Sequence, residues 1–268
     1  MTVRDPFQTG RAALPCLAAI LFFVTGAMAE TTNYLSDAEI QGRNLAQQLL
    51  EQQPAANFSQ TGVLKIRSSN SPEQDIPMDF ETEKCPPGWR SLYRTRWLTT
   101  KEKNEITFTL VVTHDGPNLN SYELSKILLP SPSNNLTITC KTNLTGAQIM
   151  TPFAGSDFWV ADLGLEFFHW PEQKVLKHEM RRSRACKVLE STNPNPSANG
   201  YARVVSWIDN ESSGIVHADA YDASGRLLKQ FDPKSFKKIN GQWELQEMEI
   251  RNVQTGSRTR LEFDLKPK

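Results

Sequence analysis

The chain has 268 residues, with 30 basic and 30 acidic side chains and a net charge of zero. A protein that binds nucleic acid presents a basic surface, so this balance argues against a nucleic-acid partner. The length is enough for one large β domain or for two small ones.

Residues 1–29 have the pattern of a cleaved secretory signal peptide. Arg4 and Arg11 precede an apolar run over residues 12–25, and Ala27-Met28-Ala29 follows it. A basic start, a short apolar stretch and a small-x-small site define such a peptide. The run is shorter than the roughly 20 residues that a membrane anchor needs. We therefore expect cleavage after Ala29 and a mature chain that resides in the periplasm and does not span the membrane.

Three cysteines remain in the mature chain, namely Cys85, Cys140 and Cys186. An odd number in an oxidising compartment predicts one disulfide with one buried thiol, or a bond between two chains. Cys186 lies in an apolar, strand-like run, which favours a buried thiol. We favour a disulfide between Cys85 and Cys140, which requires Cα atoms within about 7 Å of each other.

An amphipathic helix is predicted near the mature N-terminus. Ser36 and Glu39 have the spacing of a capping box, and Leu35 precedes them as a candidate staple. Pro54 ends the helix. Such a helix must lie on an apolar surface, because four apolar side chains share one of its sides. These side chains are Ile40, Leu45, Leu49 and Leu50.

Most of the remaining chain alternates polar and apolar residues with the period of two that is typical of β-strands. Turn sequences separate these runs at short intervals, among them Asp222–Gly225, Asn240-Gly241 and Thr255-Gly256. Strands joined by such tight turns form antiparallel sheets rather than parallel βαβ units.

The middle of the chain departs from this pattern. Residues 117–155 are rich in Pro, Ser, Asn and Thr. A short helix is predicted between Gly155 and Leu163, with Ser156 or Asp157 as its N-cap. Neither half offers enough strands to cover both of its faces, so we predict a single domain over residues 30–268.

The sequence contains no recognisable constellation of catalytic or metal-ligating residues. Four histidines are present, and their spacings are not those of a metal site. Neither a nucleophile elbow nor a phosphate or dinucleotide loop occurs. We therefore predict a protein that binds rather than catalyses, without a metal or a cofactor.

The strongest charge run is Arg181-Arg182-Ser183-Arg184. The simpler interpretation is the tip of a hairpin, since one predicted strand ends at Met180 and the next begins at Ala185. The alternative is a docking patch for an acidic partner.

Aromatic side chains are the best candidates for a binding site. Trp89, Tyr93 and Trp97 share one face of a predicted strand, and Phe158 and Trp159 lie in the short helix. A strongly curved sheet covered by helices encloses a cavity lined by such side chains. In an exported protein, a large apolar cavity suggests a lipid or an acyl chain. The candidate cavity residues are Phe80, Trp89, Tyr93, Trp97, Phe108, Leu110, Phe158 and Trp159.

The segment GSDFWVADL, from Gly155 to Leu163, resembles the Gly-Ser-Asp-Phe-x-x-x-Asp-Leu motif of the bacterial outer-membrane lipoprotein-sorting proteins, the LolA-like carriers. The resemblance covers residues 155–265 well and the N-terminal half in outline. Five further segments resemble the family in the same order: Cys186–Glu190, Tyr201–Asp209, Tyr221–Lys229, Glu247–Asn252 and Gly256–Thr259.

The resemblance implies a mainly antiparallel, half-open β-barrel of about eleven strands, with helices covering its concave apolar face. It predicts a periplasmic carrier of an acyl chain, a lipid or a lipoprotein anchor, with the N-terminal helix as a candidate lid. The alternative is an interaction or sensor module of an envelope complex, with the same fold, a filled core and a protein partner.

The motif residues themselves are interpreted as structural. Asp157 is expected to cap the short helix, Asp209 to lie in a turn at a strand end, and Gly225 to adopt a positive φ. The motifs therefore identify the scaffold rather than the ligand, because a shared fold does not imply a shared ligand.

Overall fold

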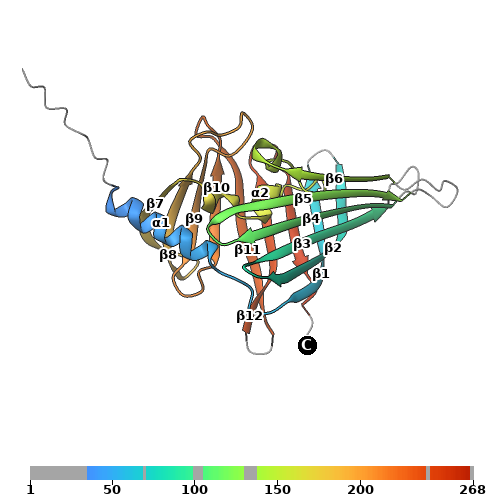
Figure 1. Cartoon of the computed structure of the whole chain (residues 1–268), viewed down its shortest axis with the longest axis horizontal. Coiled ribbons are helices and arrows are strands. Elements are labelled where there is room, and N and C mark those ends of the chain that lie inside the picture. Colours follow the sequence, from blue (N-terminus) through green and yellow to red (C-terminus); the bar gives the residue numbers. More distant parts are fainter. Residues whose placement is uncertain (1–34, 69–70, 99–104, 130–137, 240–241, 266–268) are drawn as a thin grey trace, which may run out of the picture. The chain divides into compact units, whose positions relative to one another are not determined.

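The computed structural model describes residues 35–68, 71–98, 105–129, 138–239 and 242–265. The predicted signal peptide and the Asn240-Gly241 turn lie outside these residues. The described chain forms one antiparallel sheet of thirteen strands, accompanied by short helices (Figure 1).

The element bounds are as follows. The helices are α1 (Asp37–Leu50), η1 (Gly146–Ile149), α2 (Val160–Leu163) and η2 (Glu166–His169). The first six strands are β1 (Phe58–Ser68), β2 (Ser71–Cys85), β3 (Gly88–Leu98), β4 (Glu105–Asp115), β5 (Asn118–Leu129) and β6 (Ile138–Leu144). The others are β7 (Glu172–Arg181), β8 (Arg184–Thr192), β9 (Arg203–Asp209), β10 (Ile215–Tyr221), β11 (Leu227–Ile239), β12 (Gln242–Asn252) and β13 (Arg258–Phe263).

The sheet is continuous but does not close. Its strand order is β6-β5-β4-β3-β2-β1-β13-β12-β11-β10-β9-β8-β7, so the outermost strands, β6 and β7, do not pair with each other. The first and last strands of the chain, β1 and β13, pair in the middle. The predicted half-open antiparallel barrel is therefore confirmed, with thirteen strands instead of about eleven.

The N-terminal helix α1 begins as predicted. The Glu39 backbone N–H donates to the Ser36 hydroxyl (3.4 Å), and the Ser36 N–H donates to the Glu39 carboxylate (2.7 Å). The helix packs on β7, beside which it lies in Figure 1. Its buried residues are Gly42, Leu45 and Ala46. The prediction was wrong for Ile40, which is 45% exposed and is not among the residues that α1 buries.

The turns occur where the sequence indicated them. Arg182 and Ser183 form the β7–β8 tip with φ of 50° and 61°, which confirms the hairpin interpretation. Gly225 ends the β10–β11 turn with φ 77°, a left-handed conformation that glycine adopts without steric cost. Asp209 ends β9, and its carboxylate accepts hydrogen bonds from the backbone N–H and the hydroxyl of Ser212.

The central helix starts later than predicted. It begins at Val160, and neither Ser156 nor Asp157 caps it. The Ser156 hydroxyl donates to the Phe153 carbonyl (2.7 Å). The Asp157 carboxylate instead accepts hydrogen bonds from Ser257 (2.5 Å) and Thr259 (2.9 Å), so it fastens the motif to β13. These partners are about 100 residues away in sequence, and a local capping rule cannot find them.

The predicted Cys85–Cys140 disulfide is wrong. All three described cysteines are free, and Cys186 is buried as expected. Cys85 ends β2 and Cys140 lies on β6, so three strands separate them. Neighbouring strands lie about 4.8 Å apart, and this spacing places the two residues far beyond disulfide reach.

Candidate ligand-binding site

A cavity of about 270 Å³ lies between the sheet and the helical segments. Its walls come from the C-terminal end of α1, from β3 to β5, from the α2–η2 segment and from β9 to β12. Most of the lining is apolar and includes Leu50, Phe158, Leu163, Phe167, Val204, Ala218, Ala220 and Ile250. This position, between a curved sheet and its covering helices, is where a LolA-like fold was expected to hold a ligand.

Three of the predicted cavity residues line this space, namely Trp89, Tyr93 and Phe158. Tyr93 is fixed by the hydrogen bond that its hydroxyl donates to the Leu163 carbonyl (3.1 Å). Trp89 stacks on His114 with ring centroids 3.9 Å apart. Contact of these side chains with a ligand remains a prediction.

The other candidates lie elsewhere. Leu110 is fully buried in the core, and Phe80 and Phe108 are partly buried against the same cluster. Trp159 stacks on Tyr201 with ring centroids 4.4 Å apart, and Tyr201 rather than Trp159 reaches the cavity. The side chain of Trp97 lies outside the described part of the structure.

One wall of the cavity carries a buried ion pair. The ammonium of Lys229 donates to the Asp157 carbonyl (2.6 Å), lies 3.6 Å from the Asp162 carboxylate and 3.6 Å from the Trp159 ring centroid. Asp162 accepts hydrogen bonds from the Trp159 backbone N–H (2.7 Å) and the Tyr201 hydroxyl (3.1 Å). The pair links β11 to the α2 segment and leaves the wall without net charge.

Burial dominates the electrostatics of this pair. It lowers the pKa of Lys229 to about 8, because the ammonium loses its hydration, and it raises the pKa of Asp162 for the same reason. No pattern in the sequence predicts a role for Lys229. A lysine in an alternating strand is usually solvent-exposed, and only the tertiary structure shows that this one points inward.

A second pocket of about 740 Å³ adjoins the first. The two share six lining residues: Leu49, Gln52, Leu165, Phe168, Ile215 and Phe231. The lining of the second pocket also contains the apolar residues Pro233, Phe236 and Leu245. Its polar lining residues, referred to below as the polar side, are Arg182, Arg184, Asp209, Ser212 and Ser213.

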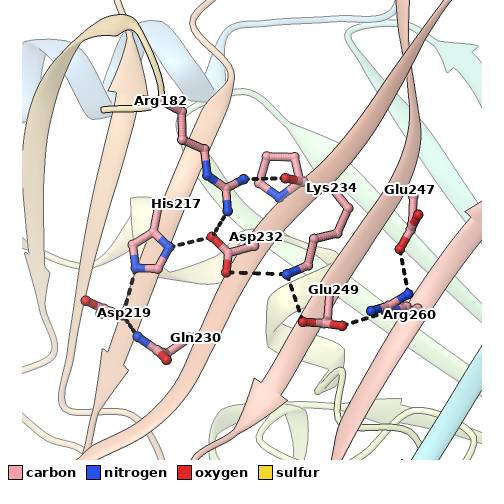
Figure 2. A network of polar contacts seen from close by, with 10 residues as sticks. Arg182, His217, Asp219, Gln230, Asp232, Lys234, Glu247, Glu249 and Arg260 are labelled. Carbon is pink, nitrogen blue, oxygen red and sulfur yellow. Dashed lines mark hydrogen bonds and ion pairs between the residues drawn. The ribbon is translucent and has the colours of Figure 1, made fainter. Parts of the chain in front are cut away.

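A network of charged side chains fastens the β7–β8 tip to the C-terminal strands (Figure 2). Arg182 donates to the Pro233 carbonyl (2.5 Å) and pairs with Asp232 (2.9 Å). His217 lies between Asp232 (2.7 Å) and Asp219 (3.0 Å). Burial opposes protonation of His217, but these hydrogen bonds outweigh it and raise its pKa.

The network continues across β12 and β13 and comprises alternating charges. Lys234 pairs with Glu249 (2.9 Å), which also accepts a hydrogen bond from Arg260 (2.7 Å). The contacts of Arg182 with Pro233 and Asp232 fix its guanidinium group against β11, and Arg182 also lines the second pocket.

Other classes of site find no support in the described residues. No group of three or more His, Cys, Asp and Glu side chains among them is arranged to hold a metal ion. In the same part of the chain, no helix has the length and apolar character needed to cross a membrane.

Comparison with known proteins identifies the fold. A sequence family described as "Uncharacterized protein" matches residues 140–265, and no curated protein matches the chain. A putative outer membrane lipoprotein-sorting protein domain from Vibrio parahaemolyticus superposes with a TM-score of 0.61 and 18% identity, over 85% of this chain and 92% of that one.

Two further solved structures have the same arrangement. A DUF1329 family protein from Desulfovibrio piger gives a TM-score of 0.55 at 19% identity, over 85% of this chain and 92% of that one. A LolA superfamily protein from Nitrosomonas europaea superposes with a TM-score of 0.54 and 16% identity, over 87% of this chain and 94% of that one. The resemblance predicted from the motifs is thus confirmed, and this chain has the LolA-like fold.

Proposed function

We propose that this protein is a periplasmic carrier that holds an acyl chain, as part of a lipid or a lipoprotein anchor, in the cavity between sheet and helices. It would serve outer-membrane lipoprotein sorting or lipid transport. The observation that carries the proposal is the apolar cavity itself. Each methylene that leaves water there contributes about 0.8 kcal/mol to binding.

The helices suit the role of a lid. Leu49 and Leu50, at the end of α1, line the cavity, and so do Leu163 and Leu165 of the central segment. A chain could enter if these short elements moved while the sheet stayed in place. The two charged groups of the wall, Lys229 and Asp162, pair with each other, which supports binding of an uncharged acyl chain rather than catalysis.

The alternative is an interaction or sensor module of an envelope complex that carries no ligand. Such a module does not use the cavity. The two proposals therefore differ in whether the cavity holds a ligand. A filled cavity in the protein purified from its own cells would decide for the carrier.

The test is native mass spectrometry with solvent extraction on protein purified from its periplasm without detergent. We expect a co-purifying lipid or acylated peptide and a polypeptide that begins at Glu30. The variant Ala220→Trp should exclude the ligand, because Ala220 lines the cavity. The matched control Ala223→Trp, in the exposed β10–β11 turn, should keep it.

A ligand-free mass, together with no uptake of added fatty acids or lysolipids, would overturn the carrier proposal. Retention of the ligand by Ala220→Trp, in a variant that unfolds with the wild-type midpoint, would place the ligand elsewhere.

A further inference from the structure

The second pocket differs from the first in the distribution of its polar residues. The apolar residues that it shares with the inner cavity are Leu49, Leu165, Phe168, Ile215 and Phe231, and its charged residues lie at the β7–β8 tip and at the end of β9. An amphiphile that extends through both pockets would therefore have its chain inside and its headgroup at this polar side. The pocket volumes, about 270 and 740 Å³, fall near the 300–1,000 Å³ that is usual for small-molecule sites.

Two arginines of the polar side could bind an anion. Arg182, Arg184 and Asp209 are the charged residues among the described residues that line the pocket. Two further carboxylates, Asp232 and Glu211, pair with the arginines from outside this lining. Asp209 is not available to a ligand. Its side chain is 2% exposed, and its carboxylate already accepts two hydrogen bonds from Ser212.

Arg184 has donors to spare. Its contacts with Glu211 (3.0 Å) and Asp209 (3.7 Å) both use Nη1. Among the described residues, neither its Nε nor its Nη2 has a partner, and these two donors form the fork that binds carboxylate and phosphate groups. By contrast, two of the three guanidinium nitrogens of Arg182 are occupied by Pro233 and Asp232.

Glu211 is a weak competitor for the positive charge of Arg184, because it contacts Nη1 and leaves the Nε–Nη2 fork open. Its side chain is 83% exposed, and ion pairs between exposed side chains contribute little because water and salt screen them. A ligand oxyanion can therefore bind the fork without disturbing the fold.

We infer that the second pocket is the headgroup site for an amphiphile that ends in an oxyanion, a carboxylate or a phosphate, with Arg184 as the residue that recognises it. This inference rests on the proposed function, since the acyl chain is assigned to the inner cavity. It also gives a role to the arginine run of the β7–β8 tip beyond that of a soluble hairpin end.

The test compares three ligands with the same chain, used below their micelle concentrations on delipidated protein. They are palmitic acid, palmitoyl lysophosphatidic acid and hexadecanol, and equilibrium dialysis gives each dissociation constant. The two oxyanions should bind about tenfold more tightly than the alcohol. Their own ranking distinguishes a carboxylate site from a phosphate site.

Two variants test the role of Arg184 in opposite directions. Arg184→Gln should remove most of the difference between oxyanions and alcohol while leaving hexadecanol binding within about twofold. Glu211→Gln should strengthen oxyanion binding only, because it removes the competing carboxylate. This second variant keeps the test decisive if Arg184→Gln fails to fold.

The outcomes separate the two proposals. Equal affinity for acid and alcohol, or an equal loss of all three ligands in folded Arg184→Gln, would overturn the headgroup site. If hexadecanol still binds and Ala220→Trp blocks it, the carrier proposal stands without this site. If none of the three ligands binds to the wild type, both proposals fall.

Discussion

At the scale of single residues, the most informative group is the buried lysine in the cavity wall. Lys229 is 3% exposed, and its ammonium is held by a carbonyl, a carboxylate and an indole ring. A buried charge with these partners is held in place, but it still loses hydration relative to the unfolded chain. The pKa of Lys229 is lowered because of that loss of hydration.

This loss predicts a pH dependence of stability. Lys229 has a pKa of about 8 in the folded state and 10.5 in the unfolded chain, so between these values the unfolded state binds more protons. The free energy of unfolding therefore rises with pH across that window. Relative to Lys229→Met, the wild type should gain up to roughly 3 kcal/mol.

Urea titrations of the two proteins at pH 7.5, 9 and 10.5 measure this difference. A constant difference across the series would contradict the assignment, since it would mean that Lys229 titrates alike in both states.

Residues of this kind mark the limit of sequence-based prediction. The motif that contains Asp157 and Asp162 is visible in the sequence, and so are the aromatic candidates Trp89, Tyr93 and Phe158. Apart from the Trp159 backbone N–H, the partners of both aspartates come from β11, from β13 or from Tyr201, which local spacing cannot bring together. The cavity was therefore predicted, whereas its polar wall was not.

At the scale of elements, the position of α1 depends on one close approach. A Cβ atom on Gly42 would lie 2.5 Å from the Gln173 carbonyl oxygen of β7, which is much closer than van der Waals contact. The capping box of α1 was predicted from sequence, because its residues are adjacent. The packing of Gly42 against β7 was not predicted, because β7 lies far along the sequence.

This close approach predicts that Gly42→Ala destabilises the protein although alanine favours helix by about 1 kcal/mol. The added methyl group must push α1 away from β7, at a net cost of roughly 1–3 kcal/mol. The exposed neighbour Asn44 provides the control, since Asn44→Ala gains helix propensity without a clash.

Thermal unfolding and hydrogen exchange over residues 37–50 measure both variants. Faster exchange of α1 in Gly42→Ala, with a lower midpoint, is expected. An increase in stability similar to that of Asn44→Ala would show that α1 does not depend on this contact.

At the scale of the whole molecule, the sheet joins its first and last strands in sequence order. Strand β1 pairs with β13 over six residue positions, and the pair Leu64–Leu261 lies at the centre of this junction. Both side chains are buried, at 2% and 0% exposure. Within the described residues, the backbone pairing between strands β1–β6 and strands β7–β13 runs through this strand pair, which forms when both the first and the last strand are present.

This topology predicts that residues 30–268 unfold as one domain. Peptide-resolved hydrogen exchange across a urea series should give the same midpoint for β3–β4 and for β9–β10, because breaking the central junction exposes the core of both halves. Leu261→Ala should lower both midpoints together, at a cost of about 2–5 kcal/mol. Leu119→Ala, at a 71% exposed position, should change neither. Two separate midpoints, or a shift confined to the C-terminal half, would mean that the continuous sheet contains two folding units and that the cavity can open by separating them.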